Sequence, residues 1–253
     1  MNKKFWKILS IALLGYTLSA CSSLSDKDRT EGWSANQLYQ TAKEALNSGR
    51  YEDAVKYYEI LESRYPLGRY AQQAQLESAY AYHKYEEPDN ALDTIDRYIR
   101  MNPTANNVDY ALYLRGLVNF SRGSGLLDRF FPRSIADLDS VRQKEAFHDF
   151  SRLVNRYPQS KYRADALQRI QHLRNTLAQS EVNVARYYMD RSAYLAAFNR
   201  AEYAIKHYQG APSVIDALEI KIRAARQLGK NDLADANLRV LQQNFPERAA
   251  KFR

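Results

Sequence analysis

An internal repeat is the feature that most constrains how this chain can fold. Five alanines recur at intervals of 37, 55, 51 and 37 residues, and four of them are followed by a large apolar residue at position +4 and a proline at position +12. The repeated alanines are Ala54, Ala91, Ala146, Ala197 and Ala234. The copy at Ala197 reaches its proline, Pro212, three residues late. Such a period predicts a stack of similar units, because one unit alone cannot bury its apolar face.

A second small residue precedes most of these alanines by about twelve positions. These residues are Ala42, Ala79 and Ala185, with Gly116 added once an insertion is allowed. The spacing resembles the tetratricopeptide repeat, in which small residues let two antiparallel helices approach and a proline ends the second helix. The resemblance implies an all-α fold, an α-solenoid of about five tetratricopeptide-like helix pairs in a right-handed superhelix with a concave groove, over about residues 35 to 253.

Composition and spacing divide the chain further. Nine Gly and seven Pro in 253 residues are too few turn formers for a fold of many short strands. We expect N-terminal repeats over 35–121, an insertion in the third repeat over 122–142, and C-terminal repeats over 143–253. The insertion carries Phe130 and Phe131, which either fold back onto the solenoid or bind a partner. Residues 163–188 contain neither Gly nor Pro and predict one long helix.

The first twenty residues have the form of an export signal. Three lysines precede an apolar run over residues 8–18, which is too short to cross a hydrocarbon layer of roughly 30 Å as a permanent helix. The run ends in Leu-Ser-Ala-Cys at Cys21, which resembles the lipobox of bacterial lipoproteins, where the cysteine is acylated and becomes the new N-terminus. The alternative is an ordinary signal peptide followed by a chance cysteine, or a cytosolic apolar leader.

This reading makes Cys21 a lipid anchor. Residues 1–20 would be the signal peptide, and residues 21–34 the lipidated N-terminus and a flexible stalk. Ser22 follows the cysteine in place of the aspartate that resembles an inner-membrane retention signal, so we expect the outer membrane, on its periplasmic face. Loss of three signal-peptide lysines lowers the formal net charge from +8 to +5. An exported chain with this modest charge and no long basic block is not expected to bind nucleic acid.

The repeat register predicts which side chains line the groove. The inward positions of the first three units are aromatic, amide or basic, and the candidate substrate-binding residues are Tyr39, Lys43, Gln73, Tyr80, Lys84, Tyr110, Tyr113 and Phe120. Such a surface suits an extended peptide with a free C-terminus, because it offers aromatic area and ammonium groups. The alternative is that each tyrosine simply packs against the next unit.

Enzyme chemistry finds little support in the sequence. The chain has no Gly-x-Ser-x-Gly elbow, phosphate-binding glycine loop or His-Glu-x-x-His pair, and its four histidines fall in different repeats without ligand spacing. We therefore expect a protein with no catalytic residues, metal or cofactor. The scattered carboxylates are expected to pair with Lys or Arg three or four residues away on the same helix.

Longer strings carry a more specific resemblance. The strings at 64–76 (RYPLGRYAQQAQL) and 107–116 (NVDYALYLRG), together with the lipobox, the repeats and Phe130-Phe131, are similar to the BamD (ComL-type) family of outer-membrane protein assembly lipoproteins. The resemblance implies a non-enzymatic scaffold whose N-terminal repeats recognise the C-terminal signals of unfolded barrel proteins. Its implied partners are a BamA-type β-barrel subunit, docked by the C-terminal repeats, and accessory lipoproteins of the same complex.

The same resemblance assigns a partner-binding role to Arg200. This residue lies in an Asn-Arg-x-Glu string, the position of a partner-facing arginine in that family, although it has nearby carboxylates of its own. A different class of function is a peptidoglycan-associated envelope lipoprotein linked to competence for DNA uptake, as the older family name suggests.

Overall fold

The structure is a computed structural model that describes residues 29–121 and 140–252. Every regular element of these residues is helical. The elements are α2 (Ala35–Asn47), α3 (Tyr51–Arg64), α4 (Arg69–Lys84), α5 (Pro88–Met101), α6 (Val108–Ser121), α7 (Ser140–Arg156), α8 (Arg163–Asp190), α9 (Tyr194–His207), α10 (Val214–Gln227), α11 (Asn231–Asn244), α12 (Pro246–Ala249) and the 3₁₀ turn η3 (Ala250–Phe252). None of the described helices combines the length and the apolar character needed to cross a membrane.

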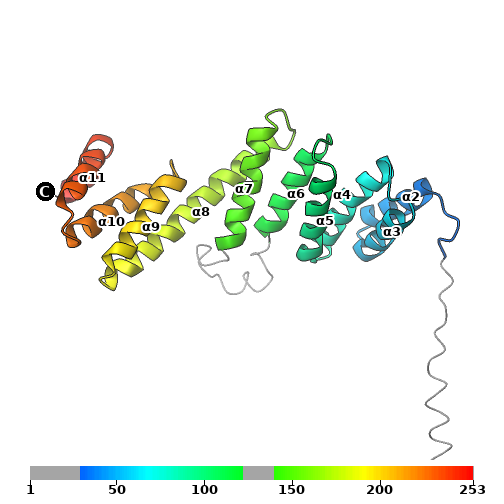
Figure 1. Cartoon of the computed structure of the whole chain (residues 1–253), viewed down its shortest axis with the longest axis horizontal. Helices are drawn as coiled ribbons and strands as arrows, with labels where there is room; N and C mark the ends of the chain where they lie inside the picture. The colour runs from blue at the N-terminus through cyan, green and yellow to red at the C-terminus, as the bar shows by residue number, and fades with distance from the viewer. Residues whose placement is uncertain (1–28, 122–139, 253) are drawn as a thin grey trace, which may run out of the picture.

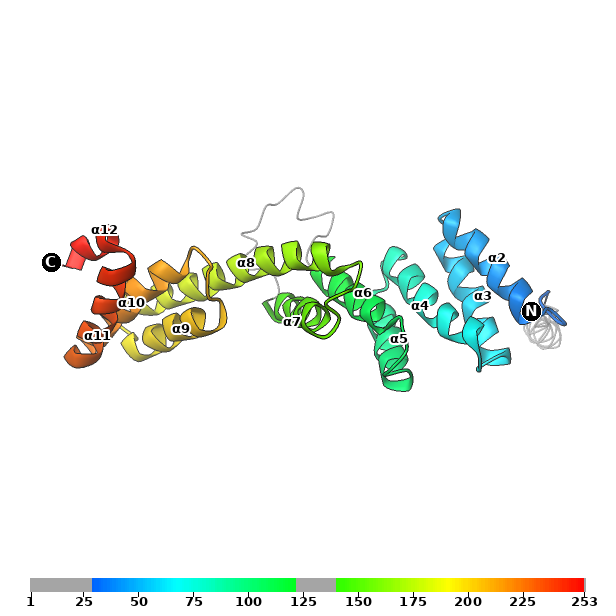
Figure 2. The same ribbon diagram turned by 90° about the horizontal axis from the view of Figure 1, so that it is seen from above.

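The helices form an extended array of consecutive pairs. Each helix packs against its neighbours in sequence, and the two ends of the array lie far apart (Figures 1 and 2). The pairs are α2/α3, α4/α5, α6/α7, α8/α9 and α10/α11, and we call the members of each pair helix A and helix B. The prediction of an all-α solenoid of about five helix pairs is confirmed. The right-handed sense of the superhelix stays a prediction.

The repeated small residues lie where helix A meets helix B. All five alanines that define the repeat have no exposed surface, and the same holds for Ala42, Ala79 and Ala185. Gly116 of α6 makes the closest approach, because a Cβ atom there would lie 2.6 Å from Cε1 of Phe150 on α7. Phe150 is itself fully buried, so glycine is required at this position.

One turn geometry joins helix A to helix B in four of the pairs. In each, a residue with positive φ ends helix A, at Gly49, Glu86, Ser192 and Gly229. The next backbone N–H donates to a carbonyl five residues earlier, as from Arg50 to Ala45 and from Lys230 to Ala225, both at 2.9 Å. This is the Schellman ending of a helix, which turns the chain back on itself. In the third pair, residues 122–139 stand between the helices, so Phe130 and Phe131 lie outside the described residues.

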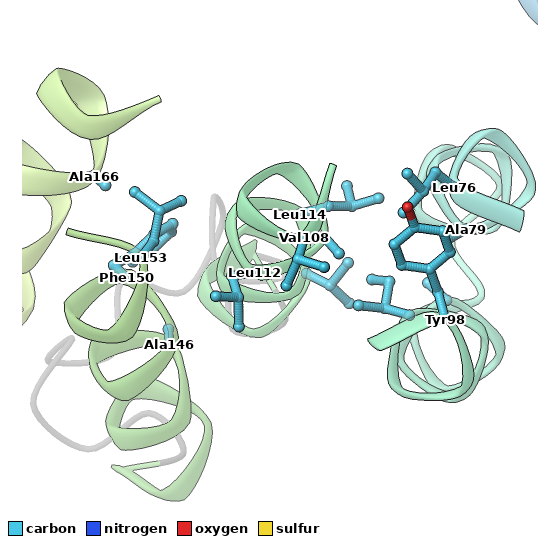
Figure 3. Close-up of a cluster of buried hydrophobic side chains, with 14 of the residues drawn as sticks. Leu76, Ala79, Tyr98, Val108, Leu112, Leu114, Ala146, Phe150, Leu153 and Ala166 are labelled. Atoms are coloured by element: carbon cyan, nitrogen blue, oxygen red, sulfur yellow. The ribbon is translucent and has the colours of Figure 1, made fainter. Parts of the chain in front are cut away.

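Prolines end the helix B segments as predicted. Helices α3, α5, α7 and α11 each end two residues before a proline, because the residue preceding proline disfavours helical backbone. The predicted long helix is α8, which runs for 28 residues and joins the third pair to the fourth. The largest core cluster fills the middle of the array, where Tyr98 of α5 faces Leu76 and Ala79 of α4 (Figure 3). This packing fixes the spacing of the helix A segments that carry the site.

Candidate functional site

A pocket of about 820 Å³ lies among the first three repeats and the start of α8. We call it the N-terminal pocket. Its walls come from helix A of three successive repeats, from Tyr51 at the start of α3, and from the two loops that lead into α6 and α8. The lining residues are Lys43, Leu46, Asn47, Tyr51, Gln73, Leu76, Glu77, Tyr80, Asn106, Asn107, Asp109, Tyr110, Lys161 and Tyr162.

Glu77 of α4 holds one wall of the pocket together. Its Oε1 atom accepts hydrogen bonds from the Tyr39 hydroxyl at 2.9 Å and from Lys43 Nζ at 2.6 Å. Its Oε2 atom accepts a short hydrogen bond from the hydroxyl of Tyr58, whose side chain is fully buried. The carboxylate therefore links α4 to α2 through Tyr39 and Lys43, and to α3 through Tyr58.

Burial and the Glu77 charge act together on these tyrosines. Desolvation is the largest cause that raises the pKa of Tyr39 and of Tyr58, and the hydrogen bonds to Glu77 raise both further. Both hydroxyls therefore remain protonated donors at neutral pH. The Glu77 cluster is a fixed part of the scaffold, in which both carboxylate oxygens already accept hydrogen bonds.

A second part of the pocket lining is aromatic. The rings of Tyr110 and Tyr162 lie 5.4 Å apart, and Tyr162 also stacks on Tyr113 at 4.7 Å with an angle of 16° between the ring planes. Burial raises the pKa of Tyr110, which keeps this ring neutral. Together with Tyr80 of α4, the rings of Tyr110 and Tyr162 offer flat apolar area bordered by polar tips.

Two lysines differ in what they already bind. Lys43 is neutralised by Glu77, whereas the ion pairs found within the described residues include none that joins Lys161 to a carboxylate. Lys161 is exposed, with Nζ 5.0 Å from the centre of the Tyr162 ring. The nearby carboxylate of Asp109 accepts from Ser160 Oγ at 2.6 Å and from the Tyr110 N–H at 2.7 Å. Lys161 is therefore the lysine better placed to bind an anionic group of a ligand.

The structure brings only part of the predicted groove together. Lys43, Gln73, Tyr80 and Tyr110 line the N-terminal pocket, and Lys84 lies beside it with Nζ 5.9 Å from the Tyr80 ring centre. Tyr39, Tyr113 and Phe120 are absent from the lining and make packing contacts instead.

Tyr39, Tyr113 and Phe120 each contact a residue of a neighbouring helix. Tyr39 is only 7% exposed and hydrogen bonds to Glu77. The Tyr113 hydroxyl donates to Asp165 at 2.8 Å, and the guanidinium carbon of Arg169 lies 5.1 Å from the Phe120 ring centre. At these three positions the side chains pack against neighbouring helices, which was the alternative to a role in the groove.

Sequence reasoning missed Glu77, Lys161 and Tyr162. Glu77 stands four residues after Gln73 and three before Tyr80, so the helical spacing on α4 held the signal that would have found it. Lys161 and Tyr162 precede α8 in a connecting loop, where the register of helix A gives no prediction.

Arg200 has a carboxylate partner on another helix. Its guanidinium lies 3.1 Å from Glu181 Oε2 on α8, and Lys144 Nζ lies 3.1 Å from the other oxygen of the same carboxylate. Glu181 is 6% exposed whereas Arg200 is 46% exposed, so part of the guanidinium still faces solvent. Among the described residues, His, Asp and Glu form no cluster of three or more that could hold a metal ion.

Comparison with known proteins decides the family. The family model described as YfiO, outer membrane lipoprotein, matches residues 32–241. The chain is also 47% identical to the outer membrane protein assembly factor BamD of Neisseria meningitidis serogroup B, with 95% of this chain and 92% of that protein covered. This chain belongs to the BamD family of outer membrane lipoproteins. The BamD protein of Vibrio cholerae is 36% identical, with 94% of this chain and 98% of that protein covered.

The BamD family match extends across both halves of the solenoid, so the N-terminal pocket and Arg200 both lie within it. Among solved structures, PilW, titled a widely conserved type IV pilus biogenesis factor, is similar at 16% identity and a TM-score of 0.36, with 86% of this chain and 97% of that chain covered.

Proposed function

We propose that this BamD-family chain is a non-enzymatic lipoprotein scaffold of the outer-membrane β-barrel assembly machinery. In this proposal the N-terminal pocket recognises the C-terminal signals of unfolded barrel proteins. The C-terminal repeats dock a BamA-type barrel subunit, and accessory lipoproteins bind alongside. The names of its relatives, outer membrane protein assembly factors, support the general role.

One observation carries the substrate part of the proposal. The N-terminal pocket combines a tyrosine wall with one lysine that is already paired and one that is exposed. A peptide that ends in an aromatic residue offers a ring for Tyr80 and Tyr110 and a terminal carboxylate for Lys161. A charge-assisted hydrogen bond to that carboxylate would distinguish a chain end from an internal segment.

The test compares a peptide ending in a free carboxylate with the same peptide ending in an amide. We expect the amide to bind the mature protein roughly tenfold more weakly, which corresponds to about 1.4 kcal/mol. Lys161→Gln should remove most of that difference and leave binding of the amide peptide unchanged. Lys43→Gln is the matched control and should keep the difference, because Lys43 is engaged by Glu77.

Two outcomes would contradict the substrate assignment. If neither peptide binds, or if both bind a chain in which Tyr80 and Tyr110 are replaced by Ser, the N-terminal pocket is not the recognition site. If the peptides bind there and Lys43→Gln removes the preference for the free acid, Lys161 has the wrong role.

The anchor has a separate test. Cys21 carries the proposed thioether, and acyl chains on one residue bind membranes without a spanning helix because each buried CH₂ contributes roughly 0.8 kcal/mol. Cys21→Ala should therefore move the protein from the membrane pellet to the soluble fraction. Retention of the variant in the pellet at the wild-type level would count against lipidation.

A further inference from the structure

The loops that lead from helix B of one repeat to helix A of the next share one edge of the array. In the first three repeats they lie within residues 64–69, 100–107 and 156–163, which we call the B-to-A edge. The connections α5–α6 and α7–α8 project on the upper side of Figure 1. None of these residues is Asp or Glu, and the exposed cations among them are Arg69, Arg100, Arg156, Lys161 and Arg163.

The opposite edge, formed by the turns from helix A to helix B, is acidic in the first two repeats. The turns from helix A to helix B in the first two repeats lie within residues 48–53 and 84–89. Arg50 and Lys84 are their only cations, and their acidic residues are Glu52, Asp53, Glu86, Glu87 and Asp89. The first two repeats are therefore polarised across their width, with a basic edge facing away from an acidic one.

Apolar and aromatic side chains accompany the cations of the B-to-A edge. Leu67 is 88% exposed and Met101 is 65% exposed, although both are large apolar residues. The guanidinium of Arg69 lies 5.1 Å from the Tyr70 ring centre, and that of Arg156 lies 5.7 Å from the Tyr157 ring centre. Cations mixed with tyrosines and isolated apolar tips are the composition that favours the headgroup region of a bilayer.

The N-terminal segment leaves the array at the same edge. The Arg64 guanidinium donates to the Thr30 hydroxyl at 2.8 Å and to the Thr30 carbonyl, and the Tyr65 hydroxyl donates to the Trp33 carbonyl at 2.8 Å. These bonds fix residues 30–33 against the end of α3. Arg29 stands eight residues after Cys21, a distance that a chain spans over at most roughly 29 Å.

We propose that the B-to-A edge of the first three repeats lies on an anionic phospholipid surface. Leu67 and Met101 enter the headgroup region, and Arg69 and Arg100 contact lipid phosphates. The inference rests on the lipid anchor of the proposed function, since a short tether that leaves at this edge holds it near the bilayer. Lys161 and Asn106 belong to both the B-to-A edge and the N-terminal pocket, so the pocket would open beside the membrane.

The experiment uses the full lipidated chain in vesicles of phosphatidylethanolamine and phosphatidylglycerol. Acylation occupies the thiol of Cys21, the one cysteine of the sequence, so an added cysteine takes a single environment-sensitive dye. Leu67→Cys places the dye on the B-to-A edge. Ser48→Cys places it on the opposite edge of the same repeat, where the residue is also exposed. A nitroxide on the lipid headgroup should quench the dye at position 67 at least threefold more than at position 48.

Charge reversal tests the source of the contact. Arg69→Glu with Arg100→Glu should reduce quenching at position 67 at least twofold, as should replacing phosphatidylglycerol by phosphatidylcholine or raising the salt. Arg50→Glu with Lys84→Glu is the matched control on the other edge and should change quenching at position 67 little. Circular dichroism confirms that each pair of substitutions leaves the helices folded.

Vesicle flotation separates the two ways to fail. If the protein does not float with the vesicles, the anchor is absent, and both the proposed function and the membrane-facing edge are overturned. If it floats and the dyes at positions 67 and 48 are quenched equally, or position 48 more, the anchor stands and the orientation is wrong. Quenching at position 67 that ignores lipid charge would overturn the role of Arg69 and Arg100.

Discussion

The two halves of the solenoid build different surfaces from the same helix pair. In the N-terminal half the helix A segments leave a pocket of about 820 Å³ with a tyrosine wall. In the C-terminal half the corresponding hollow between α8 and α10 is about 290 Å³, and one of its lining residues is Arg248 from the chain's own terminal segment. Arg248 contacts Glu219 at 2.5 Å and also pairs with Asp216.

The buried cores of the two regions also differ in the size of their side chains. The core of the first repeat contains Leu38, Tyr58 and Leu61, whereas the core around α9 is mostly alanine, with Ala197, Ala201 and Ala204 all fully buried. The first repeat therefore combines large side chains with its buried alanines, whereas the helices around α9 meet mainly through alanine. The same helix pair thus carries cores of different composition beside hollows of different size.

Gly116→Ala should show the largest effect, because Gly116 lies at a close contact between α6 and α7. The added methyl group would overlap the buried Phe150 ring, so we expect a loss of about 3 kcal/mol in the free energy of unfolding. Urea unfolding measures it, and a second substitution, Phe150→Leu, should recover part of the loss. At the corresponding position of the fourth repeat, Ala185→Gly should cost only about 1 kcal/mol. Similar losses at both positions would remove the difference between the halves.

Glu77→Gln should destabilise the chain by about 2 kcal/mol. The neutral amide cannot compensate the charge of Lys43, and its NH₂ group, a donor, replaces one of the two carboxylate oxygens that accept from Lys43 and the tyrosine hydroxyls. Glu219→Gln is the matched variant in the C-terminal half and should cost about 1 kcal/mol, because Arg248 keeps Asp216 as a partner and is 37% exposed. Chemical unfolding of both variants checks this order, and a reversed order would contradict the view of Glu77 as a fixed scaffold group.

Much of the fold is predictable because it depends on local periodicity. The alanines of the repeat, the prolines after helix B and the length of α8 each follow from spacing within one or two helices, and the structure confirms them. These features are steric, and steric requirements at a helix contact leave a regular mark on the sequence.

The site was less predictable because its contacts join separate helices. Pairing within one helix was expected, and it occurs at Arg169 with Asp165. The carboxylates that organise the molecule instead pair across helices, as Glu77 does with Lys43 and as Asp149 does with Arg115. A long side chain reaches several neighbours, so the sequence does not specify which charge it meets. For that reason the helix register predicts Tyr39 in the groove, whereas its hydroxyl donates a hydrogen bond to Glu77.

The pH dependence of stability should have opposite signs at Asp149 of the third helix pair and at Glu202 of the fourth. Burial raises the pKa of Asp149 above its usual 3.8 despite the hydrogen bonds from Arg115 and Asn119. The folded state therefore holds the Asp149 proton more tightly than the unfolded state, and this residue's contribution falls as the pH rises from 3.8 through the raised pKa. A hydrogen bond from Lys221 lowers the pKa of Glu202 below 4.5, so its contribution is present above 4.5 and is lost as the pH falls through the lowered pKa.

Two isosteric variants test the sign of each residue's contribution to the pH dependence of stability. Asp149→Asn should remove a contribution that lowers the free energy of unfolding as the pH rises. Glu202→Gln should remove a contribution that raises it as the pH rises. Unfolding by urea at a series of pH values between about 3 and 6 gives both slopes. If both substitutions changed the slope in the same direction, the contrast would fail between Asp149, where desolvation outweighs the ion pair, and Glu202, where the ion pair outweighs desolvation.

Arg200→Gln should have the smallest effect on stability, below about 1 kcal/mol, because the arginine is 46% exposed and Lys144 still neutralises Glu181. Arg200→Glu is a poorer test, since it sets a second carboxylate beside the buried Glu181. Lys144→Gln removes the other cation from the same carboxylate and is the matched control. Binding to a BamA-type subunit should weaken at least tenfold in Arg200→Gln and little in Lys144→Gln. Equal weakening in both would mean that Arg200 acts only by holding Glu181 and does not contact the partner.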